Sequence, residues 1–325
     1  MERDEPASFD FPAYLEGKFA IDTASLNAPL YARFQDFLRH TVNPRILDLG
    51  TGTGAMLRRI IKLELTGQVE LIGLDREDQN LAAGADRIEQ ALRSGGYTLR
   101  EKRESAETKP IRAERRGTEI RVEFLRGDIL DTRITGKLEP FDCITAHAFM
   151  DLMPLKRTVS IIRTLLSSDG VFYPTINYDG LTVLLPEYEE PALERRLLRI
   201  YNRSMEQRRI GGRKTGGSLS GRRLYQALEE GGFAILGIGS SDWNVFPSGG
   251  AYTEEQKLFL TAILSMIERE ARRFRTRSEV GVPAGSDLLV EPKLLADWHA
   301  DRLEAVRNDR LALIVHQLDL LAKPV

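Results

Sequence analysis

Short apolar runs alternate with stretches of helical periodicity along most of the chain. Six of these runs have the length of a strand and predict β-strands over 45–49, 69–75, 120–125, 141–146, 170–176 and 233–238. Elsewhere the apolar residues recur every three or four positions, which predicts helices over 55–65, 78–93, 155–167 and 218–231. Such an alternation of strands and helices is typical of a parallel sheet that helices cover on both faces.

Two helical segments lie outside this alternation. Near the N-terminus, apolar residues recur at helical spacing from Leu30 to Leu38 and predict a helical lead-in. Residues 243–308 predict a second helical segment, in which Thr253–Gln256 matches a capping box. The run over 310–318 that follows has β character, and we expect it to complete the sheet.

This pattern divides the chain into four parts. They are a helical N-terminal segment over 1–40, an α/β core over 41–242, a helical insertion or cap over 243–308, and the last core strand over 309–325. We expect the core to be a doubly wound, mostly parallel sheet of seven strands.

Composition narrows the kind of protein further. The 325 residues include 46 Lys and Arg against 48 Asp and Glu, which gives a net charge of −2, and 42% of them are apolar. An ordinary globular protein has these proportions, and the balanced charge argues against a dedicated nucleic-acid binder. The single cysteine, Cys143, excludes a disulfide framework and multi-cysteine metal sites, and we expect no metal.

The sequence shows no signal for export or membrane insertion. The charged residues 1–5 have no apolar segment behind them, and no run approaches the roughly 20 apolar residues that span a bilayer. We therefore expect a cytoplasmic protein that acts without a membrane, and the sequence leaves a homodimer open.

Two charged segments interrupt the regular pattern. Residues 94–119 predict a solvated loop or hairpin, because they lack the interleaved aromatic residues that would stack on nucleic-acid bases. Six arginines from Arg195 to Arg209 precede a glycine-rich segment over 211–217. They predict either a solvated helix that leads to a flexible loop, or a lid whose cations attract an anionic substrate.

The strongest chemical signal is a glycine-rich turn between the first strand and the next helix. Gly50, Gly52 and Gly54 alternate there, and Asp48 stands two positions before the first of them. Glycines let a ligand approach the backbone, and the helix that follows directs free N–H groups at the ligand. Asp75 ends the next strand, where one carboxylate can accept hydrogen bonds from two ribose hydroxyls. The pattern therefore fits a nucleoside cofactor.

The alternating spacing resembles motif I of the class I S-adenosylmethionine-dependent methyltransferases, D/E-x-G-x-G-x-G, rather than the G-x-G-x-x-G of nicotinamide-binding proteins. The resemblance implies a ribose site at Asp75, an adenine site at Gly127–Ile129, and a methionyl site beside the fourth strand. The cofactor-binding residues implied in this way are Asp48, Gly50, Thr51, Gly52, Gly54, Asp75, Arg76, Gly127, Asp128, Ile129, Ala146 and His147. In this family S-adenosylmethionine donates the methyl group and leaves as S-adenosylhomocysteine.

The acceptor is less clear from the sequence. The segment Ala146–Asp151 lacks the N/D-P-P-Y/F turn of nucleic-acid amino methyltransferases, and no Pro-Cys nucleophile for cytosine exists. We therefore expect a small-molecule acceptor that is methylated on oxygen, nitrogen or carbon. The candidate catalytic residues are His147 and Asp151, and the candidate substrate residues are Tyr173, Asn177, Tyr178, Asp242 and Trp243.

Each candidate also has a structural interpretation, such as packing, helix capping or a turn over Asn177–Gly180. Lys18 and Tyr14 are candidates to reach the cofactor carboxylate from the lead-in helix. Three other functions stay open at this point. One is an NAD(P)-dependent oxidoreductase on a related sheet, and another is a noncatalytic module that binds the cofactor or a partner. The third is an RNA methyltransferase that uses the basic stretches over 94–119 and 195–214.

Overall fold

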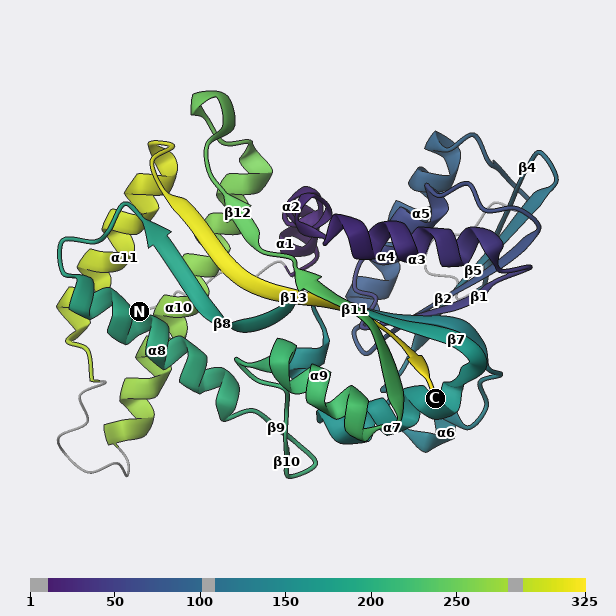
Figure 1. Cartoon of the computed structure of the whole chain (residues 1–325). Helices are drawn as coiled ribbons and strands as arrows, with labels where there is room; N and C mark the ends of the chain where they lie inside the picture. Colours follow the sequence, from purple (N-terminus) through teal and green to yellow (C-terminus); the bar gives the residue numbers. More distant parts are fainter. Residues whose placement is uncertain (1–10, 101–108, 280–288) are drawn as a thin grey trace, which may run out of the picture.

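A mixed sheet of 11 strands forms the centre of the protein in the computed structural model, which describes residues 11–100, 109–279 and 289–325 (Figure 1). Its order is β11-β13-β7-β6-β1-β2-β5-β4-β3, and the five strands from β7 to β5 are parallel. These five are β1 (Arg45–Leu49), β2 (Gln68–Asp75), β5 (Thr118–Arg126), β6 (Phe141–His147) and β7 (Leu166–Thr175). The other end of the sheet adds β11 (Phe233–Ser240) and β13 (Ala312–Pro324).

Helices cover both faces of the parallel strands, as the alternating pattern predicts. Ile46 of β1 packs with α3 (Ala28–His40), α4 (Ala55–Ile61) and α5 (Asp78–Ser94) on one face. Its neighbour Leu47 points to the opposite face, where α7 (Leu155–Leu165) and α9 (Ser220–Glu230) pack. The short α6 (Thr132–Thr135) follows β5. The doubly wound α/β fold is therefore confirmed.

The predicted number of seven strands is wrong. The sheet also contains β3 (Thr98–Leu99), β4 (Ile111–Arg115), β8 (Asn177–Leu185) and β12 (Trp243–Val245). β3 and β4 form an antiparallel hairpin beside β5, within the charged segment 94–119, of which 101–108 lie outside the described residues. A turn over Asn177–Gly180 was one interpretation of the sequence. The structure has the start of β8 there instead, because Asn177 pairs with β13.

β13 is the strand that ties the molecule together. Its C-terminal half pairs antiparallel with β11 and contacts β7, and its N-terminal half pairs with β8 and β12. It runs to Pro324 and is therefore longer than the run over 310–318 that predicts it.

The cap packs on β8, β12 and this N-terminal half of β13. It contains α8 (Pro191–Glu206), α10 (Glu254–Glu279) and α11 (Pro292–Arg307). Inside it, the Arg302 guanidinium donates to both carboxylate oxygens of Glu194 at 2.8 Å, and Trp298 Nε1 donates to one of them at 3.0 Å. α8 belongs to this helical cluster although its sequence lies inside the predicted core range.

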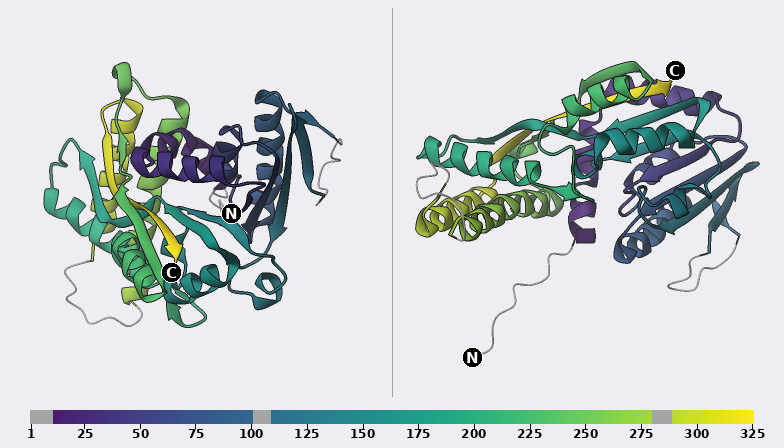
Figure 2. Two further views of the ribbon diagram at one scale, coloured as in Figure 1. Left: turned by 45° about the vertical axis from the view of Figure 1, so that its right-hand side comes forward. Right: turned by 90° about the horizontal axis from the view of Figure 1, so that it is seen from below.

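Two short N-terminal helices lie between the core and the cap. They are α1 (Phe11–Gly17) and α2 (Phe19–Ser25), and Figures 1 and 2 show them where the two lobes meet. Glu16 on α1 accepts hydrogen bonds from Thr53 and Arg58 of the core, at 2.8 Å each, and α1 also packs on α10. Among the described residues, no helix has the length and apolar character to cross a membrane.

Candidate functional site

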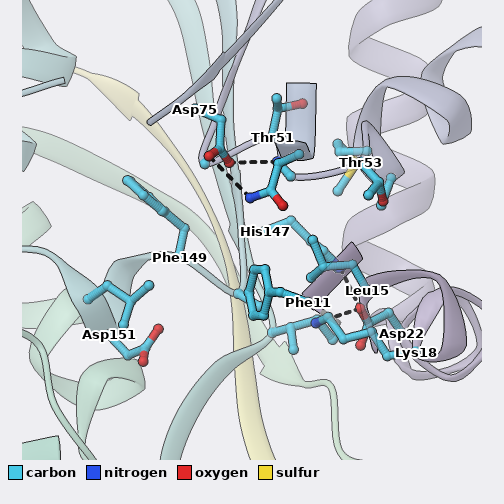
Figure 3. A pocket seen from close by; sticks show the side chains of 18 of the residues that line it. Phe11, Leu15, Lys18, Asp22, Thr51, Thr53, Asp75, His147, Phe149 and Asp151 are labelled. Atoms are coloured by element: carbon cyan, nitrogen blue, oxygen red, sulfur yellow. Dashed lines mark hydrogen bonds and ion pairs between the residues drawn. The ribbon is translucent and has the colours of Figure 1, made fainter. Parts of the chain in front are cut away.

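A cavity of about 510 Å³ opens at the carboxyl ends of the parallel strands (Figure 3). It lies where the sheet order reverses, because β1 continues to β2 on one side and its other neighbour, β6, comes later in the chain. In open α/β sheets this reversal leaves a crevice that binds ligands. Residues from β1, β2 and β6 and from the loop after β5 line one end of the cavity, and residues of α1, α2 and the cap line the other end.

The glycine loop supplies bare backbone to this cavity. Gly50, Gly52 and Gly54 have φ values of +62°, +54° and +76°, a region that residues with a side chain rarely adopt. A Cβ on Gly50 would lie 2.2 Å from Cδ2 of Phe149, which also lines the cavity. Gly54 begins α4 as its N-cap and does not itself line the cavity. The loop therefore requires glycine for both its conformation and its space.

Asp48 lies buried behind this loop. Its carboxylate accepts hydrogen bonds from the hydroxyls of Thr51 and Thr145, each at 2.7 Å. Burial raises the pKa of Asp48 to about 6, although both hydrogen bonds oppose the shift. Among the described residues Asp48 has no ion-pair partner, so a buried carboxylate at the cavity wall favours a ligand with a cationic group.

Asp75 and Asp128 provide two further carboxylates at the core end. Asp75 Oδ1 accepts from the backbone N–H of Glu77 at 3.0 Å and from Asn80 Nδ2 at 3.3 Å, and its Oδ2 accepts only from the backbone N–H of Gly52, at 2.9 Å, among the described residues. Asp128 Oδ1 accepts from the N–H of Leu130 at 2.8 Å. Both carboxylates keep lone pairs for a ligand, because each oxygen can accept two hydrogen bonds.

The remaining predicted cofactor residues differ in whether they line the cavity. Arg76, Gly127 and Ile129 line the cavity, and Arg76 lies 3.8 Å from Asp128 Oδ2. Ala146 is fully buried in β6 and does not line it.

His147 belongs to a buried polar network. Its Nε2 lies 3.0 Å from Asp22 Oδ2 and its Nδ1 lies 2.7 Å from the hydroxyl of Thr175. Asp22 also accepts from Lys18 Nζ at 2.8 Å and from Trp243 Nε1 at 2.9 Å. Figure 3 shows Lys18 and Asp22 beside His147, apart from Asp75. α2 thus brings a carboxylate to the end of β6.

The protonation states follow from these contacts. Burial would raise the pKa of Asp22, but Lys18 and His147 more than offset it and hold that pKa well below its usual range. Burial, with the nearby Arg59 guanidinium, lowers the pKa of His147 to about 4, so the ring is uncharged at neutral pH. A carboxylate can only accept, so Nε2 carries the proton and Nδ1 accepts from Thr175. Neither ring nitrogen is left to take a proton from an acceptor molecule.

Asp151 lies on the opposite side of the cavity, in the short helix η1 (Met150–Leu152). Its Oδ2 lies 3.2 Å from Arg208 NH1, and burial raises the pKa of this carboxyl. Its own backbone N–H also donates to this carboxylate, which keeps further lone pairs for a ligand. Asp151 is therefore the more suitable proton acceptor of the two predicted catalytic residues.

Of the predicted substrate residues, Tyr178 and Trp243 line the cavity and three do not. Tyr173 points to the opposite face of β7 and stacks on Phe34, with ring centroids 4.5 Å apart. Asn177 Nδ2 donates to the carbonyl of Leu318 at 2.8 Å, within the sheet. Asp242 accepts from the N–H of Gln317 at 3.0 Å and contacts His316. Tyr173 lies within β7, before the strand end at which the cavity opens, and strand pairing explains the other two.

Several lining residues were not predicted. Phe11, Leu15 and Asp22 come from the lead-in helices, and Tyr201 and Met205 come from α8. Lys18 and Tyr14, the two candidates named in that lead-in, also line the cavity. Asp22 has no local signal, because its partner His147 lies 125 positions away in the sequence. Among the described residues, no group of His, Cys, Asp and Glu side chains is arranged to hold a metal ion.

Comparison with known proteins agrees with this geometry. Residues 40–232 match a family model described as a methyltransferase domain, and the chain matches no curated protein. Similar solved structures include an S-adenosylmethionine-dependent methyltransferase from Thiobacillus denitrificans in complex with S-adenosyl-L-homocysteine. The two sequences are 12% identical and the TM-score is 0.42, and the alignment covers 94% of this chain and 98% of the other. A putative sarcosine dimethylglycine methyltransferase from Galdieria sulphuraria has 15% identity and a TM-score of 0.43, with 95% and 87% covered.

The family model covers more than half of the chain and the entire run from β1 to α9. It confirms the class that the alternating glycines predict and sets aside the oxidoreductase and the noncatalytic module. The chain therefore belongs to the methyltransferase-domain family and is an S-adenosylmethionine-dependent methyltransferase.

Proposed function

We propose that the cavity binds S-adenosylmethionine at its core end and a small-molecule acceptor at its cap end. The observation that carries this proposal is the bare glycine loop at the cavity wall, where Gly50 and Gly52 have positive φ values and a Cβ at Gly50 would collide with Phe149. The loop continues to Asp75 and Asp128 on one side and to the cap on the other, within one cavity. When bound, the cofactor supplies a methyl group that its positively charged sulfur activates for transfer.

In this proposal each core-end residue binds a different part of the cofactor. Asp75 accepts hydrogen bonds from the ribose hydroxyls, Asp128 accepts from the adenine amine, and Ile129 packs on the adenine ring. Asp48 stabilises the ammonium group through the glycine loop, in a buried place where such pairing has a large effect. Lys18 also lines the cavity, but it already pairs with Asp22 at 2.8 Å, so it is not assigned to the cofactor carboxylate.

The cap-end residues position the acceptor. His147 orients Asp22 and Lys18 and does not act as the base, since both ring nitrogens are engaged. Asp151 Oδ1 takes the proton of an oxygen or nitrogen acceptor, and its raised pKa makes it a stronger base than an exposed aspartate. α1, α2 and the cap enclose this end and hold the acceptor in line, which favours a small molecule over a nucleic acid.

Replacing Asp75 by alanine tests the cofactor site. Asp75→Ala is expected to weaken the binding of S-adenosylhomocysteine by about 1–3 kcal/mol, because the ribose hydroxyls and the N–H of Gly52 lose their acceptor. Isothermal titration calorimetry measures the change. Asp78→Ala is the matched control, since Asp78 is 66% exposed and pairs with Arg126. Equal dissociation constants for the two variants would contradict the ribose role of Asp75.

The affinity for S-adenosylhomocysteine should also depend on pH through Asp48. With its pKa at about 6 in the free protein, Asp48 is charged above that pH and neutral below it, and only the charged form attracts the ammonium group. The dissociation constant is expected to rise by up to about tenfold per pH unit below about pH 6. Asp48→Asn should bind more weakly and remove this dependence. A wild-type dissociation constant that stays constant from pH 5 to pH 7 would refute the assignment.

A further inference from the structure

The cap end of the cavity has the chemistry of a site for an uncharged aromatic molecule. Its walls carry five aromatic side chains together with aliphatic ones. The aromatic residues are Phe11, Tyr14, Tyr178, Tyr201 and Trp243, and the aliphatic ones include Met205, Ile263 and Val315. Aromatic walls of this kind favour a flat ligand, because rings gain energy from stacked and edge-to-face contacts beyond their buried area.

Every charged side chain at this end has a partner of the opposite sign. Lys18 pairs with Asp22 at 2.8 Å, and Asp151 pairs with Arg208 at 3.2 Å. The end therefore carries no net charge to draw in a carboxylate or phosphate, and placing an unpaired anion beside Asp151 would cost free energy.

The arginines of α8 do not alter this balance. Arg195, Arg199 and Arg203 are exposed on the outer side of the helix, and none of them lines the cavity. The interpretation of these arginines as a lid over an anionic substrate therefore has no support from the cavity. They fit the solvated helix that was the other interpretation.

Two polar groups at this end remain available to a ligand. The hydroxyl of Tyr201 has no hydrogen-bond partner among the described residues, and the carboxylate of Asp151 keeps lone pairs beyond those that face Arg208 and its own backbone N–H. Asp151 also contributes to raising the pKa of Tyr201 to about 12, after burial as the main cause. Tyr178 differs, because its hydroxyl already donates to Asn202 Oδ1 at 2.7 Å. A ligand must therefore donate a hydrogen bond to Asp151 and can pair with Tyr201.

We propose that the acceptor is an uncharged aromatic compound with a hydroxyl group, which Asp151 and Tyr201 bind while the aromatic walls hold the ring. This proposal rests on the function proposed above and names its substrate class. In the transfer, the O–H bond of the acceptor breaks, its proton goes to Oδ1 of Asp151, and the oxygen bonds the methyl carbon. The electron pair of the broken methyl–sulfur bond returns to sulfur, so the reaction needs no further reactant.

Three coumarins test the class by binding alone. 7-Hydroxycoumarin carries the hydroxyl, coumarin lacks it, and 7-hydroxycoumarin-3-carboxylic acid adds an anion. Isothermal titration calorimetry measures their binding to the full chain saturated with S-adenosylhomocysteine, at a pH of about 6.5, where 7-hydroxycoumarin is neutral. We expect 7-hydroxycoumarin to bind about tenfold more tightly than either of the others, as one hydrogen bond to a charged group would provide.

Variants connect this preference to the two polar groups. Tyr201→Phe and Asp151→Asn should each reduce the advantage of 7-hydroxycoumarin over coumarin to about threefold or less, whereas Arg195→Ala, on the outer side of α8, should leave all three affinities unchanged.

Equal or tighter binding of the carboxylic acid would overturn the proposal, and so would an absent hydroxyl preference or failure of all three to bind. Calorimetry with S-adenosylhomocysteine separates the two levels. Normal cofactor binding with a failed coumarin test rejects only the substrate class, and failed cofactor binding rejects the proposed function itself.

Discussion

Alanine at position 50 is expected to lower the affinity of the protein for S-adenosylhomocysteine about 100-fold. The new Cβ would lie 2.2 Å from Cδ2 of Phe149, and the residue would have to keep a φ of +62°. Relieving the clash costs about 1–3 kcal/mol and the left-handed backbone about 1–2 kcal/mol. The loop would relax in the free protein, so cofactor binding would have to restore it. A cost of about 3 kcal/mol corresponds to the stated loss, which calorimetry measures.

Gly211→Ala is the matched control for Gly50→Ala. Gly211 has a φ of +54° and no atom within 4 Å of an added Cβ, and it lies between β9 (Arg209–Ile210) and β10 (Arg213–Lys214), outside the cavity. It shares the backbone strain but not the clash, and its affinity should stay within about twofold of wild type. A Gly50→Ala variant that binds as tightly as this control would show that the loop does not hold the cofactor.

Removing the carboxylate of Asp22 should cause a large loss of stability, about 3–5 kcal/mol in the free energy of unfolding. The side chain is 1% exposed and is the partner of Lys18, His147 and Trp243. Asp22→Ala would leave the Lys18 ammonium buried without its counter-ion, which is far costlier than losing an exposed ion pair. Urea unfolding measures the loss.

Two further variants test whether the unpaired Lys18 charge causes the loss of stability in Asp22→Ala. Asp36→Ala removes a carboxylate that is 72% exposed and should change stability by less than about 0.5 kcal/mol. Lys18→Met in the Asp22→Ala background removes the unpaired charge and should recover part of the stability, because the two effects are coupled. If Asp22→Ala alone cost under 1 kcal/mol, the charge pair would not be the stabilising element described here.

The core could be predicted because its signals are local. Each parallel strand is a short apolar run with its own flanking turn, and the glycine loop lies between one strand and one helix. β8 escaped prediction because its start at Asn177 resembles a turn, and only pairing with β13, about 140 residues later, makes it a strand. Sequence periodicity contains no information on such a distant pairing.

The residues of the site also differ in whether local sequence signals could locate them. Asp75 and Asp128 follow strand ends and could be located from the sequence, and both line the cavity. His147 was placed correctly at the cavity, but its suitability as a base depends on Asp22, which a different helix supplies. Tyr173 was placed wrongly because it lies inside β7, where it packs against Phe34 of α3, and not at the strand end that borders the cavity. Tertiary contacts therefore determine the chemistry of the cap end.

β13 has a consequence for how this enzyme handles its ligands. Enzymes with two lobes joined by linkers can select substrates by swinging shut around a hinge. Here one continuous backbone is hydrogen-bonded into both lobes, so rotation between them would break the ladder at β8 and β12 or at β11. The walls of the acceptor chamber thus keep a constant spacing, and discrimination between molecules depends on the fit to a preformed shape.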